Sequence, residues 1–419
     1  MGKSGIVLLT LILMVQCMAG TAPQAAAEPV VETGIEVLRQ RDFDLLKDLR
    51  VGLITNPTGV DSRLRSTVDI LNRAEEVELV ALYGPEHGIR GNIPAGTSPD
   101  RETDPVTGLP VYSLYGKTRK PTAQMLAGVE ALVFDLQDIG CRSYTYISTL
   151  GLVMEAAAEN RIKVVILDRP NPLGGNLVEG MLWEKEFKSF VSQFNIPYVH
   201  GLTAGELAGL LNGEKMLSGG VQCDLEVVKM KGWRRDMVFA ETGLPWVPTS
   251  PHIPRADTPF YYAATGIAGE LNPNLAGVGY TLPFQVLAAP WLKADKLAGY
   301  MNNLDLPGVV FRPIWFKPFY KKQQDRKLQG VQIHFTDYDK ARPTLIQFQF
   351  LDYAARNYPE HNLFAVNPDR LRMFDLVCGS AQVRKLFSGK NPDYGKFEKL
   401  WKSGIKDFKG LAARYYLYE

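Results

Sequence analysis

The sequence is poor in the residues that build metal centres and disulfide frameworks. Its 419 residues include four cysteines and five histidines. The cysteines are too widely spaced for a disulfide framework or a zinc pattern: Cys17, Cys141, Cys223 and Cys378. No two histidines stand at the close spacing that zinc sites favour, so we predict no metal site. We expect the mature cysteines to be small buried residues, although one bridge is an alternative.

Several nucleotide-binding and hydrolase motifs are also missing. No G-x-G-x-x-G follows the first expected strand, and no P-loop is present, which argues against dinucleotide and nucleotide cofactors. No G-x-S-x-G nucleophile elbow occurs, which disfavours a serine hydrolase. We therefore predict a protein without a cofactor.

An excess of charge of either sign is lacking as well. Lys and Arg number 47 against 45 Asp and Glu, and no basic block stands out. Nucleic acid is therefore not an expected partner.

The only pronounced apolar run outside the expected core lies at the N-terminus. Lys3 precedes the apolar residues 6–15, and Ala25-Ala26-Ala27 offers an A-x-A cleavage site. We predict a signal peptide over 1–27 and an exported mature chain, periplasmic or extracellular, without a membrane span. An uncleaved anchor and lipidation at Cys17 are the alternatives.

Short apolar strands alternate with helical patterns in the first half of the chain. Strands are expected at 51–55, 77–83, 131–136 and 163–167, and helices at 65–74, 121–127, 149–160 and 203–212. Thr203 and Glu206 have the spacing of a capping box at the start of the last helix. This alternation predicts the α/β class, with a Rossmann-like parallel sheet covered on both faces. We assign this domain to 28–250.

A proline-rich stretch, PWVPTSPHIPRADTPF, begins at residue 245 and interrupts this pattern. We expect it to carry the chain between domains. Beyond it, a strand at 330–337 and a helix at 344–357 predict a second, smaller α+β domain over 251–419.

Polar residues follow four consecutive expected strands. In parallel sheets ligands bind outside the carboxyl ends of the strands, so these residues should share one neighbourhood. They are Asn56, Glu86, His87, Asp135, Asp138, Asp168, Arg169 and Asn171.

Glu86 is the leading candidate catalytic residue. It follows a buried strand in the stretch LVALYGPEHGIRG, so partial desolvation should favour its protonated form and suit it to acid catalysis. His87 could assist it as an acid, a base or a hydrogen-bond partner. The alternative is that Glu86 only ties down its loop through an ion pair with Arg90 or Arg142.

Other groups are candidates for supporting roles. Asp135 or Asp138 could orient Glu86 or a substrate hydroxyl, although Asp138 could equally form an Asx-turn. Tyr144 and Tyr146, following Arg142, would suit an anionic sugar, or they could form an ordinary surface loop. Asp168 and Arg169 could instead form an internal salt link. Arg90 is a further candidate for substrate binding, and secondary candidates are His200 and His252.

The motifs together resemble a known family. GLITNPTGVDS, YGPEHGIRG, VFDLQDIGCRSYTYISTLG, LDRPNPLGG, HGLTAGELA, GLPWVPTSPHIP and LPGVVFRP occur in this order. They are similar to those of the exo-β-N-acetylmuramidase family, formerly a domain of unknown function, over nearly the whole mature chain.

The resemblance implies a Rossmann-like domain and a smaller C-terminal domain with the site in the cleft between them. It implies release of terminal N-acetylmuramic acid from peptidoglycan fragments, with Glu86 in the position of the catalytic glutamate. An arginine such as Arg142 or Arg169 could bind the lactyl carboxylate.

One segment departs from the family pattern. Where much of the family carries a stretch like EGTNxSEGRGT, this chain keeps Glu270 but has Ala276 and Val278 in place of a charged Glu and Arg. We expect this segment to face the cleft, so the loss of both charges should alter substrate contacts.

Glycoside hydrolysis with Glu86 as general acid is the mechanism we expect. The second carboxylate is left open among Asp135, Asp138 and Asp168, and the acetamido group of the substrate could replace it. The alternative function is an exported protein that binds sugars or muropeptides without turnover. A metal-dependent or esterase-like hydrolase is a third and weaker reading.

Overall fold

A computed structural model describes residues 30–86, 88–91, 101–320, 326–389 and 391–419. The expected signal peptide and His87 lie outside these residues.

The N-terminal part is built on a seven-stranded sheet. Its spatial order is β3-β4-β2-β1-β5-β6-β7, and all neighbours are parallel except β3 and β4. The strands are β1 (Arg50–Thr55), β2 (Glu78–Gly84), β3 (Arg101–Thr103), β4 (Pro110–Ser113), β5 (Ala131–Asp135), β6 (Lys163–Leu167) and β7 (Leu225–Val228).

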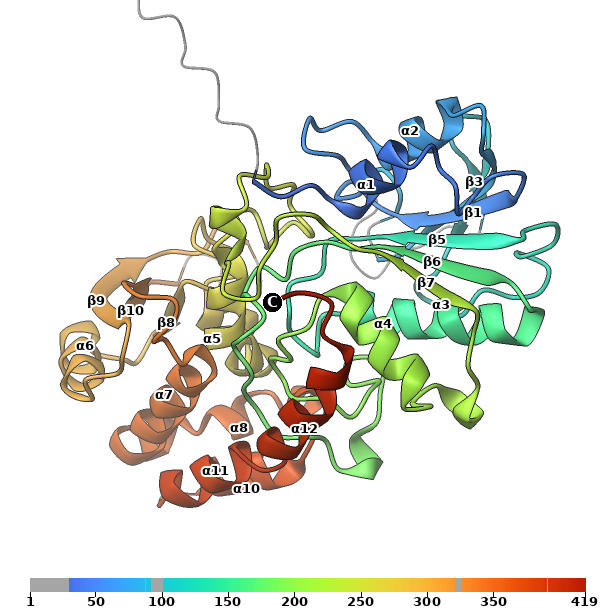
Figure 1. Cartoon of the computed structure of the whole chain (residues 1–419). Helices are drawn as coiled ribbons and strands as arrows, with labels where there is room; N and C mark the ends of the chain where they lie inside the picture. Colours follow the sequence, from blue (N-terminus) through green and yellow to red (C-terminus); the bar gives the residue numbers. More distant parts are fainter. Residues whose placement is uncertain (1–29, 87, 92–100, 321–325, 390) are drawn as a thin grey trace, which may run out of the picture.

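Helices cover both faces of this sheet (Figure 1). On one face lie α1 (Gly34–Gln40) and α2 (Thr67–Arg73), and on the other α3 (Tyr146–Asn160) and α4 (Ala204–Gly213). Leu53 packs into the first layer and its neighbour Ile54 into the second. Because both faces are buried, the central strands are continuous apolar runs rather than alternating ones.

The C-terminal part contains a smaller antiparallel sheet of order β8-β10-β9. Its strands are β8 (Val286–Ala289), β9 (Val309–Phe316) and β10 (Leu328–Phe335). The helices of this part are α5 (Thr258–Leu271), α6 (Ala294–Asn303), α7 (Pro343–Asn357), α8 (Leu363–Val366), α9 (Leu371–Cys378), α10 (Ala381–Phe387), α11 (Tyr394–Trp401) and α12 (Ile405–Ala412).

The end of the chain returns to the first sheet. Phe408 and Ala412 of α12 are buried in the same apolar core as α3 and α4. Beyond α12, the ring of Tyr416 lies against the guanidinium of Arg235, and Cζ of Arg235 is 3.4 Å from the centre of this ring. Figure 1 shows α12 and the C-terminus running along the sheet domain. The two parts are thus tied together by the tail as well as by the linker.

The predicted fold class is confirmed, and most expected elements exist with ends shifted by a few residues. The strand predicted at 163–167 is β6, and the capping box predicted for Thr203 and Glu206 opens α4. The helix predicted at 121–127 is wrong, because this segment forms turns. Gly128, at φ +81°, ends it before helical hydrogen bonds can propagate. The sequence reading also missed β3, β4, β7 and α1.

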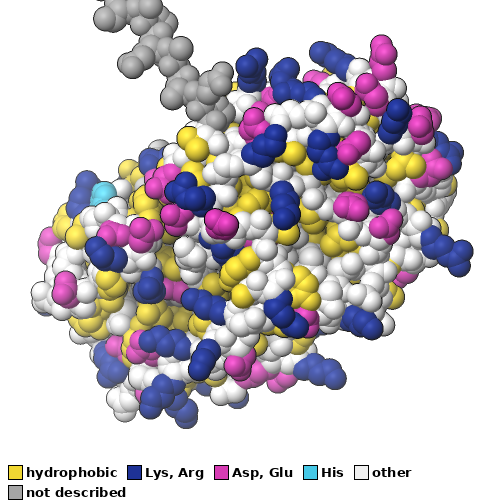
Figure 2. Space-filling view, in the orientation of Figure 1, with side chains coloured by type: hydrophobic (Ala, Val, Ile, Leu, Met, Phe, Trp, Pro, Cys, Tyr) yellow, Lys and Arg dark blue, Asp and Glu magenta, His cyan; other side chains and the backbone are white. Residues whose placement is uncertain are grey.

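Among the described residues, Cys141, Cys223 and Cys378 are buried and form no disulfide bond, in keeping with the expectation that they are small buried residues. Within the described ranges, no helix is both long and apolar enough to cross a membrane. Figure 2 shows basic and acidic side chains interspersed over one face, in keeping with the net charge of +2.

Candidate functional site

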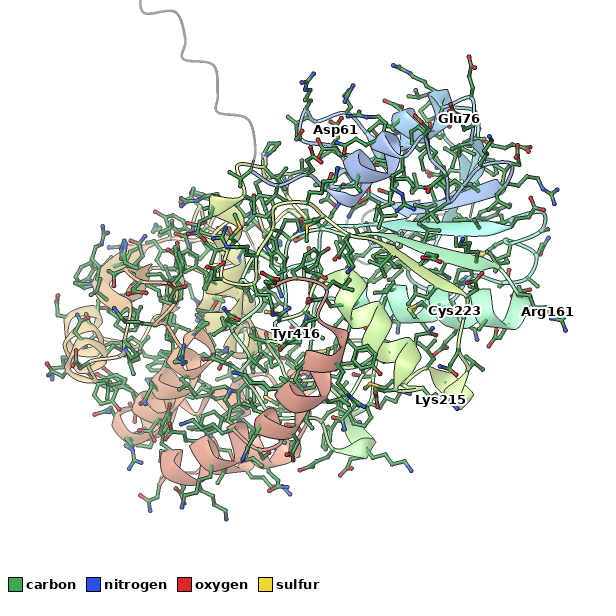
Figure 3. The ribbon with its side chains drawn as sticks, in the orientation of Figure 1. Asp61, Glu76, Arg161, Lys215, Cys223 and Tyr416 are labelled. Atoms are coloured by element: carbon green, nitrogen blue, oxygen red, sulfur yellow. The ribbon has the colours of Figure 1, made fainter. Side chains whose placement is uncertain are left out.

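The strand register brings the predicted polar residues to one edge of the sheet. Ile54 of β1 pairs with Tyr83 of β2, and Thr55 pairs with Asp135 of β5. Figure 3 labels three residues at the opposite edge of the sheet, each of which precedes a strand: Glu76, Arg161 and Cys223. The residues that follow the strands therefore lie on the side that meets the C-terminal part.

Glu86 follows β2 and is partly buried. The hydroxyl of Tyr115, just beyond β4, donates a hydrogen bond to its carboxylate. Burial, the Glu86 charge and this hydrogen bond together raise the pKa of Tyr115 to about 12. Tyr115 is thus a neutral donor to Glu86 at physiological pH.

Neither arginine proposed as an ion-pair partner for Glu86 is used in that way. Arg90 binds Asp104 through two nitrogens, at 2.9 and 3.0 Å. Burial alone would raise the pKa of Asp104, but hydrogen bonds from Arg90 and Thr107 lower it to about 2. Arg90, a predicted substrate-binding residue, therefore forms an ion pair with Asp104 in this structure.

Arg142 lies entirely inside the protein. Nη1 donates to the carbonyl oxygens of Met181 and Ile196, and Nη2 donates to those of Val377 and Cys378. Because Val377 and Cys378 belong to α9, the guanidinium joins the sheet domain to the C-terminal helices. The structure does not bring Arg142 to a surface that a ligand could reach.

A chain of hydroxyl groups runs from the end of β1 toward the interdomain segment. Nδ2 of Asn56 donates to the hydroxyl of Tyr146 at 2.8 Å, which donates to the carbonyl of Thr249 at 2.5 Å. The hydroxyl of Tyr144 donates to Oγ1 of Thr249 at 2.8 Å. These contacts hold two tyrosine rings edge to face, 4.9 Å apart. The predicted residues Asn56, Tyr144 and Tyr146 therefore do come together.

Tyr146 also connects two carboxylates electrostatically. Burial raises its pKa well above the usual value, and the charges of Tyr144, Glu86 and Asp138 add to this effect.

Asp138 differs from the other candidate aspartates in being reachable. Its side chain keeps 13% of its surface exposed. Oδ2 accepts the N–H of Gly140 at 2.7 Å, which is the predicted Asx-turn, whereas Oδ1 has no hydrogen-bond partner in the described part of the chain. The buried His200 lies alongside, with Nε2 3.8 Å from Oδ2.

Asp135 is closed off by a buried ion pair. Arg169 binds its two oxygens, at 2.5 and 3.0 Å, and Thr67 donates a further hydrogen bond at 2.5 Å. Arg169 also donates to the carbonyl of Val60. The salt link predicted between Asp168 and Arg169 is therefore wrong, because the guanidinium pairs with Asp135 instead.

Asp168 is also fully enclosed. Its carboxylate accepts hydrogen bonds from the hydroxyls of Tyr418 and Thr203 at 2.6 and 2.7 Å and from the N–H of Gly205 at 2.8 Å. Burial raises its pKa to about 6, and these hydrogen bonds oppose the rise only in part. Asp168 therefore anchors α4 and the C-terminal tail, rather than facing the site.

Asn171 has a similar structural role. Its Oδ1 accepts from the N–H of Leu173 at 3.0 Å, and its Nδ2 donates to the carbonyl of Leu202 at 3.0 Å. These bonds join the loop after β6 to the turn before α4.

The remaining candidates lie on the C-terminal side. Nε2 of His252 is 2.7 Å from the hydroxyl of Tyr320. Glu270 forms an ion pair with Arg370; burial raises the pKa of Glu270 and the Arg370 charge opposes this. No described contact joins Glu270 or His252 to Glu86.

The side chains of Ala276 and Val278 point into the protein, and the expectation that their segment faces the cleft stays a prediction. Ala276 is fully buried and Val278 nearly so. The short turn Pro273–Ala276 packs against α5, which places these apolar side chains in the interior. In this chain the segment contributes packing rather than charge.

The sequence reading missed Tyr115 and Thr249. Tyr115 is the last tyrosine of the stretch PVYSLYG, and the strand before it, β4, was not predicted. Thr249 stands in the proline-rich segment, where no periodic pattern indicates a partner. A tyrosine two residues after a strand of the sheet was the signal available for Tyr115.

Cavity size alone does not locate the site. A cavity of about 400 Å³ lies where the loop after β6 meets the C-terminal part, and its lining includes Arg235, Arg342 and Lys409. None of the predicted site residues lines it, and the guanidinium of Arg235 is already used in binding Glu206. We place the site where polar strand-end groups converge.

Comparisons with known proteins agree with this fold. Residues 51–257 match the family model described as exo-β-N-acetylmuramidase NamZ, N-terminal, and 260–418 match its C-terminal counterpart. The chain is 41% identical to the peptidoglycan β-N-acetylmuramidase NamZ of Bacillus subtilis, over 99% of this chain and 98% of that protein.

Crystal structures of two DUF1343 family proteins from Bacteroides fragilis are also similar. The first is 53% identical with a TM-score of 0.90, and the match spans 94% of this chain and 100% of that protein's chain. The second is 29% identical with a TM-score of 0.70, and the match spans 93% of this chain and 99% of that protein's chain. The chain therefore belongs to the exo-β-N-acetylmuramidase family of glycosidases.

Proposed function

We propose that this protein is an exported glycosidase that releases terminal N-acetylmuramic acid from peptidoglycan fragments, with Glu86 as the general acid. The observation that carries the proposal is the state of Glu86. It is a partly buried carboxyl group after a central strand and accepts a hydrogen bond from the neutral hydroxyl of Tyr115, while Arg90 and Arg142 are engaged elsewhere. A carboxyl group held in this way at the edge of a sheet can act as a general acid.

The substrate class follows from the relatives rather than from the site. The family model names an exo-β-N-acetylmuramidase, and the Bacillus subtilis relative is named for peptidoglycan. Tyr144 is only partly buried and could offer an aromatic face to a sugar ring, with the buried Tyr146 packed edge to face against it.

Asp138 is our candidate for the second carboxylate. Asp135 is held by Arg169, and Asp168 by three donors, so neither is open to a substrate or a water molecule. The side chain of Asp138 keeps 13% of its surface exposed, although its unpaired Oδ1 is itself buried, and its charge acts on the hydroxyl of Tyr146, as that of Glu86 does. It could activate water, attack the sugar or stabilise the acetamido group.

The test compares wild type with Glu86→Gln on an aryl N-acetylmuramide, measuring release of the aryl alcohol. Glu76→Gln is the matched control, since Glu76 is exposed and precedes the same strand (Figure 3). We expect loss of activity only at Glu86. Binding of muramyl saccharides by calorimetry without any turnover in the wild type would instead support a binding protein.

Export is proposed from the N-terminal 27 residues alone. Fractionation of cells that produce the full chain, with N-terminal sequencing of the mature protein, tests it. A chain recovered from the cytoplasm with residues 1–27 intact would contradict export.

A further inference from the structure

His200 is a buried histidine whose ring is oriented by the backbone. It precedes α4, and its Nδ1 accepts the N–H of Leu202 at 3.2 Å. An imidazole nitrogen that accepts a hydrogen bond carries no proton, so the proton of the neutral ring is on Nε2. His200 therefore presents a donor at Nε2.

That donor lies close to Asp138. Nε2 is 3.8 Å from Oδ2 of Asp138, which is beyond normal hydrogen-bond length, and Oδ2 already accepts the N–H of Gly140. The other oxygen, Oδ1, and Nε2 of His200 are both buried without a hydrogen-bond partner among the residues the structure describes. Because buried donors and acceptors are paired in most native structures, a donor and an acceptor left unmatched on two neighbouring side chains call for a functional explanation.

The surrounding loops are rigid enough to make this proximity specific. Gly140 has a φ of +79°, and a Cβ there would come within 2.5 Å of Oδ1 of Asn171. Asn171 in turn donates to the carbonyl of Leu202, whose N–H orients His200. The same peptide segment thus supports both the histidine and the loop that carries Asp138.

We propose that His200 is a positioning residue for Asp138, and that the Nε2–H of His200 holds the carboxyl group of Asp138 in place during the glycosidase reaction. The inference rests on the proposed function of the site. A small approach of the two side chains, or one bridging hydroxyl group, would complete the hydrogen bond. His200 itself is covered by protein and touches no substrate.

Two substitutions separate this role from packing. The amide oxygen of His200→Asn can accept the N–H of Leu202 but leaves no donor near Asp138. The amide nitrogen of His200→Gln reaches the position of Nε2 and restores the donor. We expect His200→Asn to lower kcat on the aryl N-acetylmuramide at least about tenfold at unchanged KM, and His200→Gln to stay within about threefold of wild type.

A double-variant cycle with Asp138→Asn sharpens the test. Once Asp138 is neutral, His200→Asn should cause little further loss, because residues that act as a unit are not additive. Equal activity of the Asn and Gln variants, or fully additive losses, would overturn the proposal while leaving the glycosidase function intact.

A second measurement does not depend on turnover. The ¹⁵N spectrum of the ring of His200, assigned by its disappearance in His200→Gln, should show a neutral ring with the proton on Nε2. Asp138→Asn should shift the Nε2 signal. A proton on Nδ1, or a spectrum insensitive to Asp138→Asn, would contradict the inference even if the wild type hydrolysed no muramide and the proposed function failed.

Discussion

The hydroxyl of Tyr115 donates a hydrogen bond to the carboxylate of Glu86, and the two residues follow the adjacent strands β4 and β2. This pairing holds the carboxyl group of Glu86 against the neighbouring strand end. It therefore positions Glu86 for the role proposed above.

Removing this hydroxyl should lower activity. In Tyr115→Phe we expect kcat/KM on the aryl N-acetylmuramide to fall about tenfold, since the carboxyl group of Glu86 loses a hydrogen bond that positions it. Tyr83→Phe is the control, because its hydroxyl binds the carbonyl of Met125 elsewhere. An unchanged kcat/KM in Tyr115→Phe would show that Tyr115 does not act on the catalytic acid.

The pair of Asp135 and Arg169 should matter for stability rather than for chemistry. Asp135→Asn leaves the buried guanidinium without its charged partner, so we expect a loss of about 3–5 kcal/mol in the free energy of unfolding. Urea unfolding measures it. The double variant Asp135→Leu with Arg169→Met should recover much of the loss. A single variant as stable as wild type would contradict the structural role.

Arg142 should behave as a link between the two parts of the chain. Arg142→Met removes four hydrogen bonds to buried carbonyl groups, two of them on α9. We expect a loss of several kcal/mol in unfolding free energy, because unsatisfied buried acceptors cost about 1–3 kcal/mol each. Thermal unfolding followed by circular dichroism checks this. A stable variant with a raised KM alone would favour ligand binding by Arg142.

Asp168 predicts a particular dependence of stability on pH. Its pKa of about 6 in the folded protein lies above the unfolded value of about 3.9, so the folded state binds more protons between these values. The stabilisation is complete below about pH 4 and is lost as the pH rises through 6. The expected loss is about 3 kcal/mol.

Unfolding of wild type and Asp168→Asn by urea at pH 4.5 and 7 measures this contribution. The free energy of unfolding of wild type relative to that of Asp168→Asn should be larger at pH 4.5 than at pH 7, since asparagine does not titrate. A difference that is the same at both pH values would show that Asp168 is ionised in the folded state throughout this range.

The local parts of the fold could be predicted because their signals are local. The capping box of Thr203 and Glu206 lies within four residues, and β6 is a plain apolar run. The strand β4 was missed because its partner β3 is only three residues long and its own residues are partly exposed.

The sequence indicated which edge of the sheet carries the site, but not which residues at that edge face a ligand. Asp138 and Asp168 have the same appearance in the sequence, as polar residues after apolar strands. What closes Asp168 is Tyr418, 250 positions away in the chain. Arg142 is likewise enclosed by carbonyl groups from α9, more than 230 positions away. Such long-range partners leave no periodic trace.

The central claim is that Glu86 donates the proton to the leaving group, and its most direct test varies that group. Wild type and Glu86→Gln are compared on two substrates. The first is a dinitrophenyl N-acetylmuramide, whose dinitrophenolate leaving group departs without being protonated. The second is a muramyl disaccharide, whose sugar leaving group must be protonated. We predict that Glu86→Gln retains most activity on the first and loses about a hundredfold or more on the second. Equal losses on both substrates would contradict the assignment of Glu86 as the general acid.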